Sequence, residues 1–295
     1  RRPVMPRSGI VALTLFVVAL LPVAADSQPA PLSFSLTFLD RFKIEDDNEY
    51  VAEPSGLALA REGDALWTVS DDRRKVFKIS LEGNPLNRQS FNIGERDLEG
   101  ITLGPTADTL LVIKEQFDEI LKVSLTSKKV VSRHALFDMA GFGSIEQHFT
   151  DDVDNKGLEG ITFNQDRDSF FLLKERDPGL IIEISRDLNS ILGAYRLDAA
   201  NGFIDDDADA ADIDFSGIQY DPSRALFWIV SDQAKRLFLY DLDQDRVLQS
   251  AALGYARNGK FREIKQAEGV AIDPRSRRLY VVSDQEARLY VFDLR

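Results

Sequence analysis

Five glycines in this chain are each followed, fifteen residues later, by a carboxylate. The segments around them are alike, since each glycine opens a run such as LEGITL and each carboxylate closes a run such as LVIKE. The five pairs are Gly56 with Asp71, Gly100 with Glu115, Gly160 with Glu175, Gly217 with Asp232, and Gly269 with Asp284. A fixed internal period is typical of repeat folds, in which each copy builds the same unit. The carboxylates are therefore expected at equivalent places in successive units.

The spacing of the repeats indicates the kind of unit. The glycines are 44, 60, 57 and 52 residues apart, which suits a propeller blade of four short antiparallel strands. In the last unit, GVAIDP, RRLYVVSD and ARLYVFDL are three successive strand patterns, separated by Asp-Pro and charged turns. The chain is therefore predicted to be all-β, a single β-propeller with blades of four antiparallel strands.

The last unit lacks a fourth strand, because the chain stops 26 residues after Gly269. Residues 32–42 precede the first unit, alternate as an outer strand does, and have no other partner. Pairing the two chain ends would complete a unit of about 50 residues and would leave no long sheet edge exposed. We therefore expect five blades, closed by the N-terminal strand. Six blades would require a further blade hidden in insertions that are too polar and too short.

A large apolar residue stands eleven positions after each repeated glycine. A functional interpretation would make these side chains an aromatic binding wall. Packing between neighbouring blades is the simpler interpretation, because large apolar side chains on a second strand are usually core residues. The five residues are Trp67, Leu111, Phe171, Trp228 and Tyr280.

The N-terminal 25 residues have the features of a secretory signal peptide. Three arginines precede an apolar run at residues 9–21, and small residues at 23–25 offer a cleavage site. The run is short for a membrane span, so an uncleaved anchor is the alternative. We expect a signal peptide at 1–25 and the propeller at 26–295, in the periplasm or secreted, with peripheral membrane association left open. The chain has no cysteine, which excludes both a lipid-bearing cysteine and disulfides.

Charge narrows the choice of partners. The net charge is −13, and it becomes −16 when the three arginines of the predicted signal peptide are removed. Such acidity argues against nucleic acid and against simple adhesion to anionic lipid. The expected partners are a metal ion and an unknown small-molecule or protein ligand, and a monomer is expected.

The repeat also predicts where the acidic groups gather. In a propeller blade the start of the first strand and the end of the second strand meet on one face of the ring. The residue before each glycine takes the first place, and the residue fifteen after it takes the second. Around one end of the central channel the period thus places eight carboxylates: Asp71, Glu99, Glu115, Glu159, Glu175, Asp232, Glu268 and Asp284.

So many like charges raise one another's pKa or require a cation. Lys114 and Lys174 precede two of the glutamates and offer partial balance within their blades. A metal would be a second source of balance. Oxygen ligands without histidine or cysteine nearby suit calcium rather than zinc or copper. The alternative is a ring of structural salt bridges that joins the blades without metal.

Several segments resemble a known family. IKQAEGVAI followed by LYVVSD, GLEGITF followed by FFLLKERDP, and DFSGIQYDP followed by VSDQ resemble the YjiK family, also called the SdiA-regulated domain family. The likeness runs from residue 32 to residue 295. The resemblance implies a calcium-binding propeller of the bacterial envelope, with no established biochemical activity. Carried over by motif, the family's channel-mouth residues, and so the expected metal ligands, are Glu99, Glu115, Glu159, Glu175, Asp232, Glu268 and Asp284.

Three functions are compatible with these features. The first is a non-catalytic, calcium-stabilised module that binds a ligand or a protein. It is favoured because the only histidines are His134, in a predicted outer strand, and His148, so a histidine-based catalytic pair is hard to build. Another is an interaction scaffold that uses the outer or bottom face of the ring. No exposed apolar stripe in the sequence supports it, so it is kept only as a default.

The alternative from another class is a calcium-dependent hydrolase of phosphate or carboxylic esters at the channel mouth. Calcium would polarise the ester and activate water. Glu159 would act as the base, and Lys114, Lys174 or Arg176 would bind the anion. No motif marks a base with a distinct environment, so binding is favoured over catalysis.

Overall fold

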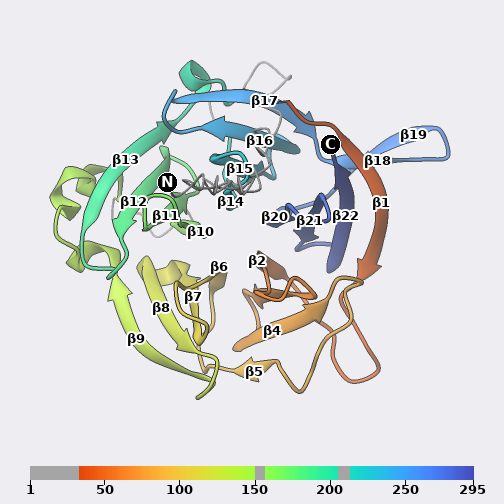
Figure 1. The fold of residues 1–295 in the computed structure, drawn as a ribbon, viewed down its shortest axis with the longest axis horizontal. Helices are drawn as coiled ribbons and strands as arrows, with labels where there is room; N and C mark the ends of the chain where they lie inside the picture. The colour runs from red at the N-terminus through yellow and green to blue at the C-terminus, as the bar shows by residue number, and fades with distance from the viewer. Residues whose placement is uncertain (1–32, 150–156, 205–212) are drawn as a thin grey trace, which may run out of the picture.

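The computed structural model describes residues 33–149, 157–204 and 213–295. These residues form a ring of five four-stranded antiparallel sheets, with one additional two-stranded hairpin (Figure 1). The prediction of five blades rather than six is confirmed. We number the blades I to V in chain order.

The strands of each blade follow one another from the centre of the ring outwards. Blade I contains β2 (Pro54–Leu59), β3 (Ala65–Ser70), β4 (Lys75–Ser80) and β5 (Phe91–Asn92). Blade II contains β6 (Leu98–Leu103), β7 (Thr109–Lys114), β8 (Glu119–Ser124) and β9 (Lys129–Ala135). Blade III contains β10 (Leu158–Asn164), β11 (Ser169–Lys174), β12 (Gly179–Ser185) and β13 (Ile191–Leu197). Blade IV contains β14 (Gly217–Asp221), β15 (Leu226–Ser231), β16 (Arg236–Asp241) and β17 (Arg246–Ala252).

Blade V is built from both ends of the chain. Its strands are β20 (Ala267–Asp273), β21 (Arg278–Ser283), β22 (Arg288–Leu294) and, on the outside, β1 (Leu36–Lys43). β1 runs antiparallel to β22, with Leu36 opposite Leu294. This confirms that the N-terminal strand closes the ring, and it removes the free edge that the last blade would otherwise expose.

The connections contain short elements. Five 3₁₀ helices are described: η1 (Glu115–Phe117), η2 (Leu136–Asp138), η3 (Phe142–Ser144), η4 (Glu146–His148) and η5 (Ala199–Asn201). A hairpin of β18 (Gly254–Arg257) and β19 (Lys260–Glu263) lies between blades IV and V and projects outwards beside β1 (Figure 1). Among the described residues, no helix is long and apolar enough to cross a bilayer. The predicted signal peptide at residues 1–25 lies outside the described residues.

Five separate apolar clusters fill the spaces between neighbouring blades. The residue eleven positions after each repeated glycine contributes to one cluster each, and all five are buried, which confirms their packing role. In order of the clusters they are Trp228, Leu111, Phe171, Trp67 and Tyr280. Blade-to-blade packing is therefore the main source of apolar burial in the ring.

The repeated glycines lie where the innermost strands approach one another. A Cβ atom on Gly56 would stand 2.4 Å from the carbonyl oxygen of Glu99 in the next blade. A Cβ on Gly217 would stand 2.5 Å from the carbonyl oxygen of Glu268. Any larger residue would push the inner strands apart, which explains why the period is marked by glycine.

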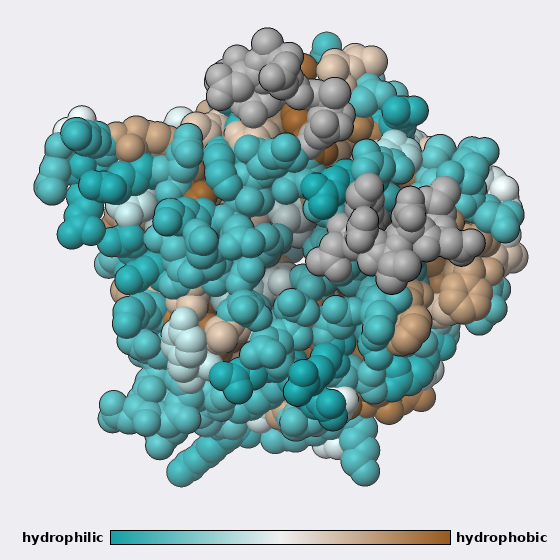
Figure 2. Space-filling model, turned by 180° about the vertical axis from the view of Figure 1, so that it is seen from behind, coloured by the Kyte–Doolittle hydropathy of each residue, from teal (hydrophilic) through white to brown (hydrophobic). Residues whose placement is uncertain are grey.

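The outer surface carries apolar side chains only here and there. Within the described part of the chain, the exposed large apolar residues are spread over strands, 3₁₀ helices and loops, and they are Leu39, Tyr50, Phe117, Val131, Phe137, Leu192, Ile204 and Phe261. Figure 2 shows the face of the ring seen from behind, which is mainly hydrophilic. This distribution gives the scaffold hypothesis no continuous apolar surface.

Candidate metal centre at one end of the ring

The register of the blades brings the repeated carboxylates to one end of the ring. Leu98 pairs with Lys114, Leu158 with Lys174, and equivalent pairs join the same strands of blades I and V. The residue before each glycine and the residue fifteen after it therefore lie at one end of their blade. We call this the acidic end of the ring. The first strands of neighbouring blades also contact one another around the whole ring, so these five strands surround a common centre.

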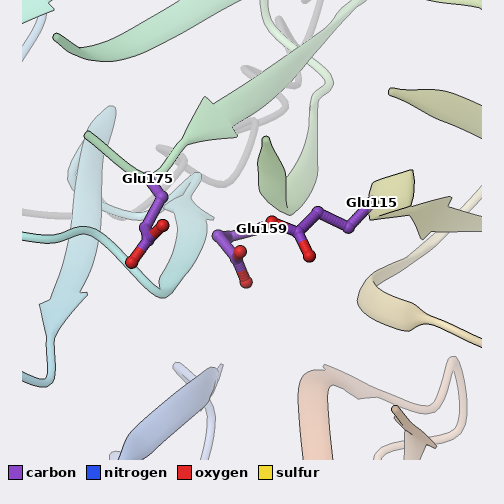
Figure 3. A group of neighbouring side chains, drawn as sticks. All are labelled: Glu115, Glu159 and Glu175. Carbon is purple, nitrogen blue, oxygen red and sulfur yellow. The ribbon is translucent and has the colours of Figure 1, made fainter. Parts of the chain in front are cut away.

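Three of these carboxylates come together. Glu115, Glu159 and Glu175 each offer one oxygen, and the three oxygens lie within 4.8 Å of one another (Figure 3). Glu159 belongs to β10, Glu175 directly follows β11, and Glu115 opens η1 directly after β7. We call these residues the glutamate trio. Among the described residues, no other trio of acidic or histidine side chains meets this spacing.

Backbone hydrogen bonds hold the trio in place. The Gly157 amide donates to a carboxylate oxygen of Glu115 at 3.2 Å, and the Glu175 amide donates to the Gly157 carbonyl at 3.0 Å. The carboxylate of Asp118 accepts the Leu158 amide at 3.0 Å. The start of β10 is thereby tied to both turns that carry the other two glutamates.

Asp118 was not among the predicted residues, although the repeat contains a signal for it. It stands eighteen residues after its glycine, where other blades carry Arg74, Pro178, Lys235 and Ala287. Burial raises the pKa of Asp118 to about 6, although the hydrogen bond from the Leu158 amide lowers it. At this turn position only blade II carries a carboxylate. That difference between the repeats was the signal in the sequence for an additional acid near the trio.

The environment of the trio disfavours negative charge. Burial, and then the neighbouring carboxylates of Glu99 and Glu115, hold the pKa of Glu159 well above its usual range. Burial raises the pKa of Glu175 to about 7, although the adjacent Arg176 lowers it. The pKa of Glu115 is also raised, again mainly by burial. Each side chain retains some surface, but protein atoms surround it, so bulk water screens these charges poorly.

The other predicted ligands lie around the same end, outside the trio. Glu99 accepts a 2.5 Å hydrogen bond from the Ser55 hydroxyl, and burial raises its pKa to about 8. Burial also holds the pKa of Glu268 well above its usual range and raises that of Asp284 to about 6. Asp232 pairs with the Lys235 ammonium at 2.5 Å and accepts the Ala267 amide at 3.2 Å.

The two lysines expected to balance the glutamates have specific partners. The Lys114 ammonium lies 2.9 Å from Glu95, which also pairs with Arg133. Lys114 therefore neutralises a residue that the repeat does not mark, rather than Glu99. The buried Lys174 ammonium donates to the carbonyl of Arg176. It also lies 5.5 Å from the ring centroid of Phe149.

Comparison with known proteins agrees with this architecture. The sequence matches the family described as SdiA-regulated over residues 39–293. The chain belongs to the SdiA-regulated family. The resemblance carried by the repeat segments is thus confirmed, and a propeller module fits this family.

Solved structures similar to the chain are also propellers. Myxococcus xanthus glutaminyl cyclase has 12% identity and a TM-score of 0.59, and the match covers 88% of this chain and 96% of that one. The propeller domain of Cps50 (Swd1) from Myceliophteria thermophila has 14% identity and a TM-score of 0.44, covering 83% of this chain and 65% of that one. At these identities, the likeness to the cyclase shows the fold alone.

Proposed function

We propose that this SdiA-regulated propeller binds calcium at the glutamate trio and uses the ion to hold a ligand, as a non-catalytic binding module of the bacterial envelope. The observation that carries the proposal is the meeting of three carboxylate oxygens within 4.8 Å. Their raised pKa values mean that the cluster must take up protons or a cation near neutral pH. A divalent ion relieves the repulsion without protonation.

The chemistry of the three side chains favours calcium. Hard carboxylate oxygens, with no cysteine in the chain, suit calcium better than zinc or copper. Calcium takes about six to eight oxygens, and Glu115, Glu159 and Glu175 supply between three and six, depending on whether they bind through one oxygen or two. The remaining positions fall to water, backbone carbonyls or a ligand. An ion with open positions is suited to recognising an anionic or polyhydroxylated partner.

Calorimetric titration of the chelated protein with calcium tests the proposal, with thermal melts beside it. We expect saturable binding, a raised Tm, and a loss of affinity of about 100-fold in Glu159→Gln, because a charged ligand is removed. Asp232→Asn is the matched control, since it changes a carboxylate of the same end that already has the Lys235 partner. Absence of saturable heat, or equal losses in both variants, would refute the site.

The envelope location rests on the predicted signal peptide. N-terminal sequencing of protein recovered from the periplasm or the medium tests it, and a mature chain that starts at Asp26 is expected. Recovery of the uncleaved chain in the membrane fraction would favour the anchor instead.

Calcium-dependent ester or phosphoester hydrolysis is the second candidate, and the environment of Glu159 favours it. In the metal-free protein the pKa of Glu159 is held well above its usual range, mainly by burial, and a carboxyl group with a raised pKa is suited to acid–base work. Because Lys114 is engaged by Glu95 and Lys174 by a backbone carbonyl, Arg176 is the better placed of the three predicted anion-binding residues. Turnover of a phenyl ester or phenyl phosphate with calcium, lost in Glu159→Gln, would establish catalysis. Unchanged turnover in that variant would exclude Glu159 as the base.

A further inference from the structure

A pocket of about 620 Å³ opens at the turn that follows Glu175. Its walls come from the turn that leads into β12, the end of β13 and the segment before β14. Arg176 belongs to this lining and directly follows Glu175 of the trio. The amide of Phe215, which also lines the pocket, donates to the Glu175 carbonyl at 3.0 Å. The pocket and the candidate metal centre therefore share one turn, in which Glu175 belongs to the trio and Arg176 to the pocket.

The lining combines apolar and charged groups. Buried Phe203 and Phe215 pack edge to face at 5.1 Å beneath the pocket, while Pro178 and Ile213 are partly exposed at its wall. The charged lining residues are Arg176, Asp177, Arg196 and Asp198. Of these, Arg196 and Asp198 pair with each other at 3.1 Å. Arg176 is thus the guanidinium on the side of the trio.

Two polar atoms at the junction of pocket and trio lack hydrogen bonds. The Arg176 Nε and the Glu175 Oε2 lie 3.4 Å apart, as an ion pair that is not aligned for hydrogen bonding. Both atoms are buried, and within the described part of the chain neither has a hydrogen-bond partner. Buried polar atoms are rarely left unpaired, because the lost hydration is costly. A cation on Glu175 and an oxyanion on Arg176 would satisfy both atoms.

Building on the proposed metal centre, we propose that this pocket binds the oxyanion group of a ligand, a carboxylate or a phosphate. One oxygen of the group ligates the metal and the others accept hydrogen bonds from Arg176, whose planar guanidinium suits such groups. An apolar portion of the ligand lies against Pro178 and Ile213. Because the Glu175 carboxylate lies 3.4 Å from Arg176, the oxyanion enters favourably only when the metal offsets the negative charge of the trio. Binding of the anion therefore depends on calcium.

Calorimetry with phenyl phosphate and with benzoate, with and without saturating calcium, tests this inference. Benzamide serves as the neutral probe. We expect at least one anion to bind in the presence of calcium, at least about 10-fold more weakly without it, and benzamide not to bind. The Arg176→Gln variant should lose about 10-fold or more of the anion affinity, because a charge-assisted hydrogen bond is removed. Arg186→Gln is the matched control, since Arg186 lies in the same blade and pairs with exposed Asp168.

The outcomes separate this inference from the metal centre. Saturable calcium binding with equal anion affinity in Arg176→Gln and the unchanged protein would overturn the pocket and leave the metal centre standing. Failure of calcium to bind would refute the metal centre, and anion binding without calcium would also overturn the linkage proposed here. Preference for benzoate or for phenyl phosphate identifies which oxyanion the pocket takes.

Discussion

Two kinds of blade build the acidic end, and they use the same backbone positions differently. Blades I and IV carry serine before the repeated glycine and Ser-Asp at the end of the second strand, whereas blades II and III carry glutamate and Lys-Glu. The Ser70 hydroxyl donates to the Ala52 carbonyl at 2.7 Å, and the Ser231 hydroxyl donates to Asp214 at 2.8 Å. Serine thus links each blade to its own entering loop, while the Lys-Glu pair gathers charge at the centre.

Blade V combines features of both kinds. It has Glu268 before its glycine but Ser283-Asp284 at the end of the second strand, and the Ser283 hydroxyl donates to the Lys265 carbonyl. The trio lies between blades II and III, where Glu115 of blade II meets Glu159 and Glu175 of blade III. Blade V also carries carboxylates at both positions, yet neither belongs to the trio, so placement by the repeat is insufficient for a cluster.

The largest expected effect concerns the glycine that both kinds of blade share. Gly56→Ala should cost about 3 kcal/mol of unfolding free energy, because the new Cβ meets backbone at 2.4 Å. Gly160→Ala should cost about 1 kcal/mol, since its nearest contact is the Ile218 side chain at 2.9 Å, which can shift. Urea denaturation measures both values. Equal costs would show that the inner strands approach one another alike in both kinds of blade.

The pH dependence of stability should also distinguish the two kinds of blade. Burial raises the pKa of Glu99 to about 8 and that of Glu175 to about 7. The folded metal-free protein therefore holds protons that the unfolded chain releases above pH 4.5, so these groups lower stability as pH rises from about 4.5 to 8. We expect the Tm to be about 5 °C lower at pH 8 than at pH 5, and calcium to restore most of the loss.

Variants locate the source of that pH dependence. Glu159→Gln should flatten the fall in Tm between pH 5 and pH 8 more than Asp232→Asn does, because Asp232 is only a secondary cause of the raised pKa of Glu268. A profile that is equally steep in Glu159→Gln would mean that the trio is not its origin.

Lys174 should contribute more to the stability of the fold than Lys114. Lys174→Met should cost about 2 kcal/mol, because the Arg176 carbonyl loses its donor and nearby carboxylates lose the positive charge of a buried side chain. Lys114→Met should cost less than about 1 kcal/mol, since Glu95 retains Arg133. Chemical denaturation of the two variants at pH 7 gives the comparison. A larger loss of unfolding free energy in Lys114→Met would mean that Lys114, rather than Lys174, is the lysine that stabilises the acidic end.

A comparably small effect is expected for the serine link of blade IV. Ser231→Ala removes the hydroxyl that binds Asp214 and accepts the Ala234 amide, and it should cost about 1 kcal/mol. Calcium affinity should not change, because blade IV contributes nothing to the trio. A change in affinity measured by calorimetry would mean that the serine-type blades also shape the metal centre.

The repeat predicts the fold well because it records strand register. The blade count, the closure by β1 and the packing role of Trp228 all follow from positions counted from the glycines. The side-chain partners are less predictable, because they come from connections outside the repeat. Glu95, which pairs with Lys114, lies in the loop before β6, and Phe149, which lies near Lys174, belongs to an insertion before β10.

The same limit applies to the candidate site. The period places all seven expected ligands at one end of the ring, yet it contains nothing about which carboxylates approach one another. That choice depends on backbone donors such as the Gly157 amide, which orients Glu115 across the boundary between blades. The trio is therefore a property of two neighbouring blades and their turns rather than of one repeat.

A crystal structure of the protein soaked with terbium, a calcium substitute, tests the central claim most directly. An anomalous difference map locates the ion without reference to affinity. We predict one strong peak bound by oxygens of Glu115, Glu159 and Glu175, at about the 2.3–2.6 Å typical of calcium sites. A peak held by Asp232 or Asp284 instead, or no peak in the centre of the ring, would contradict the claim.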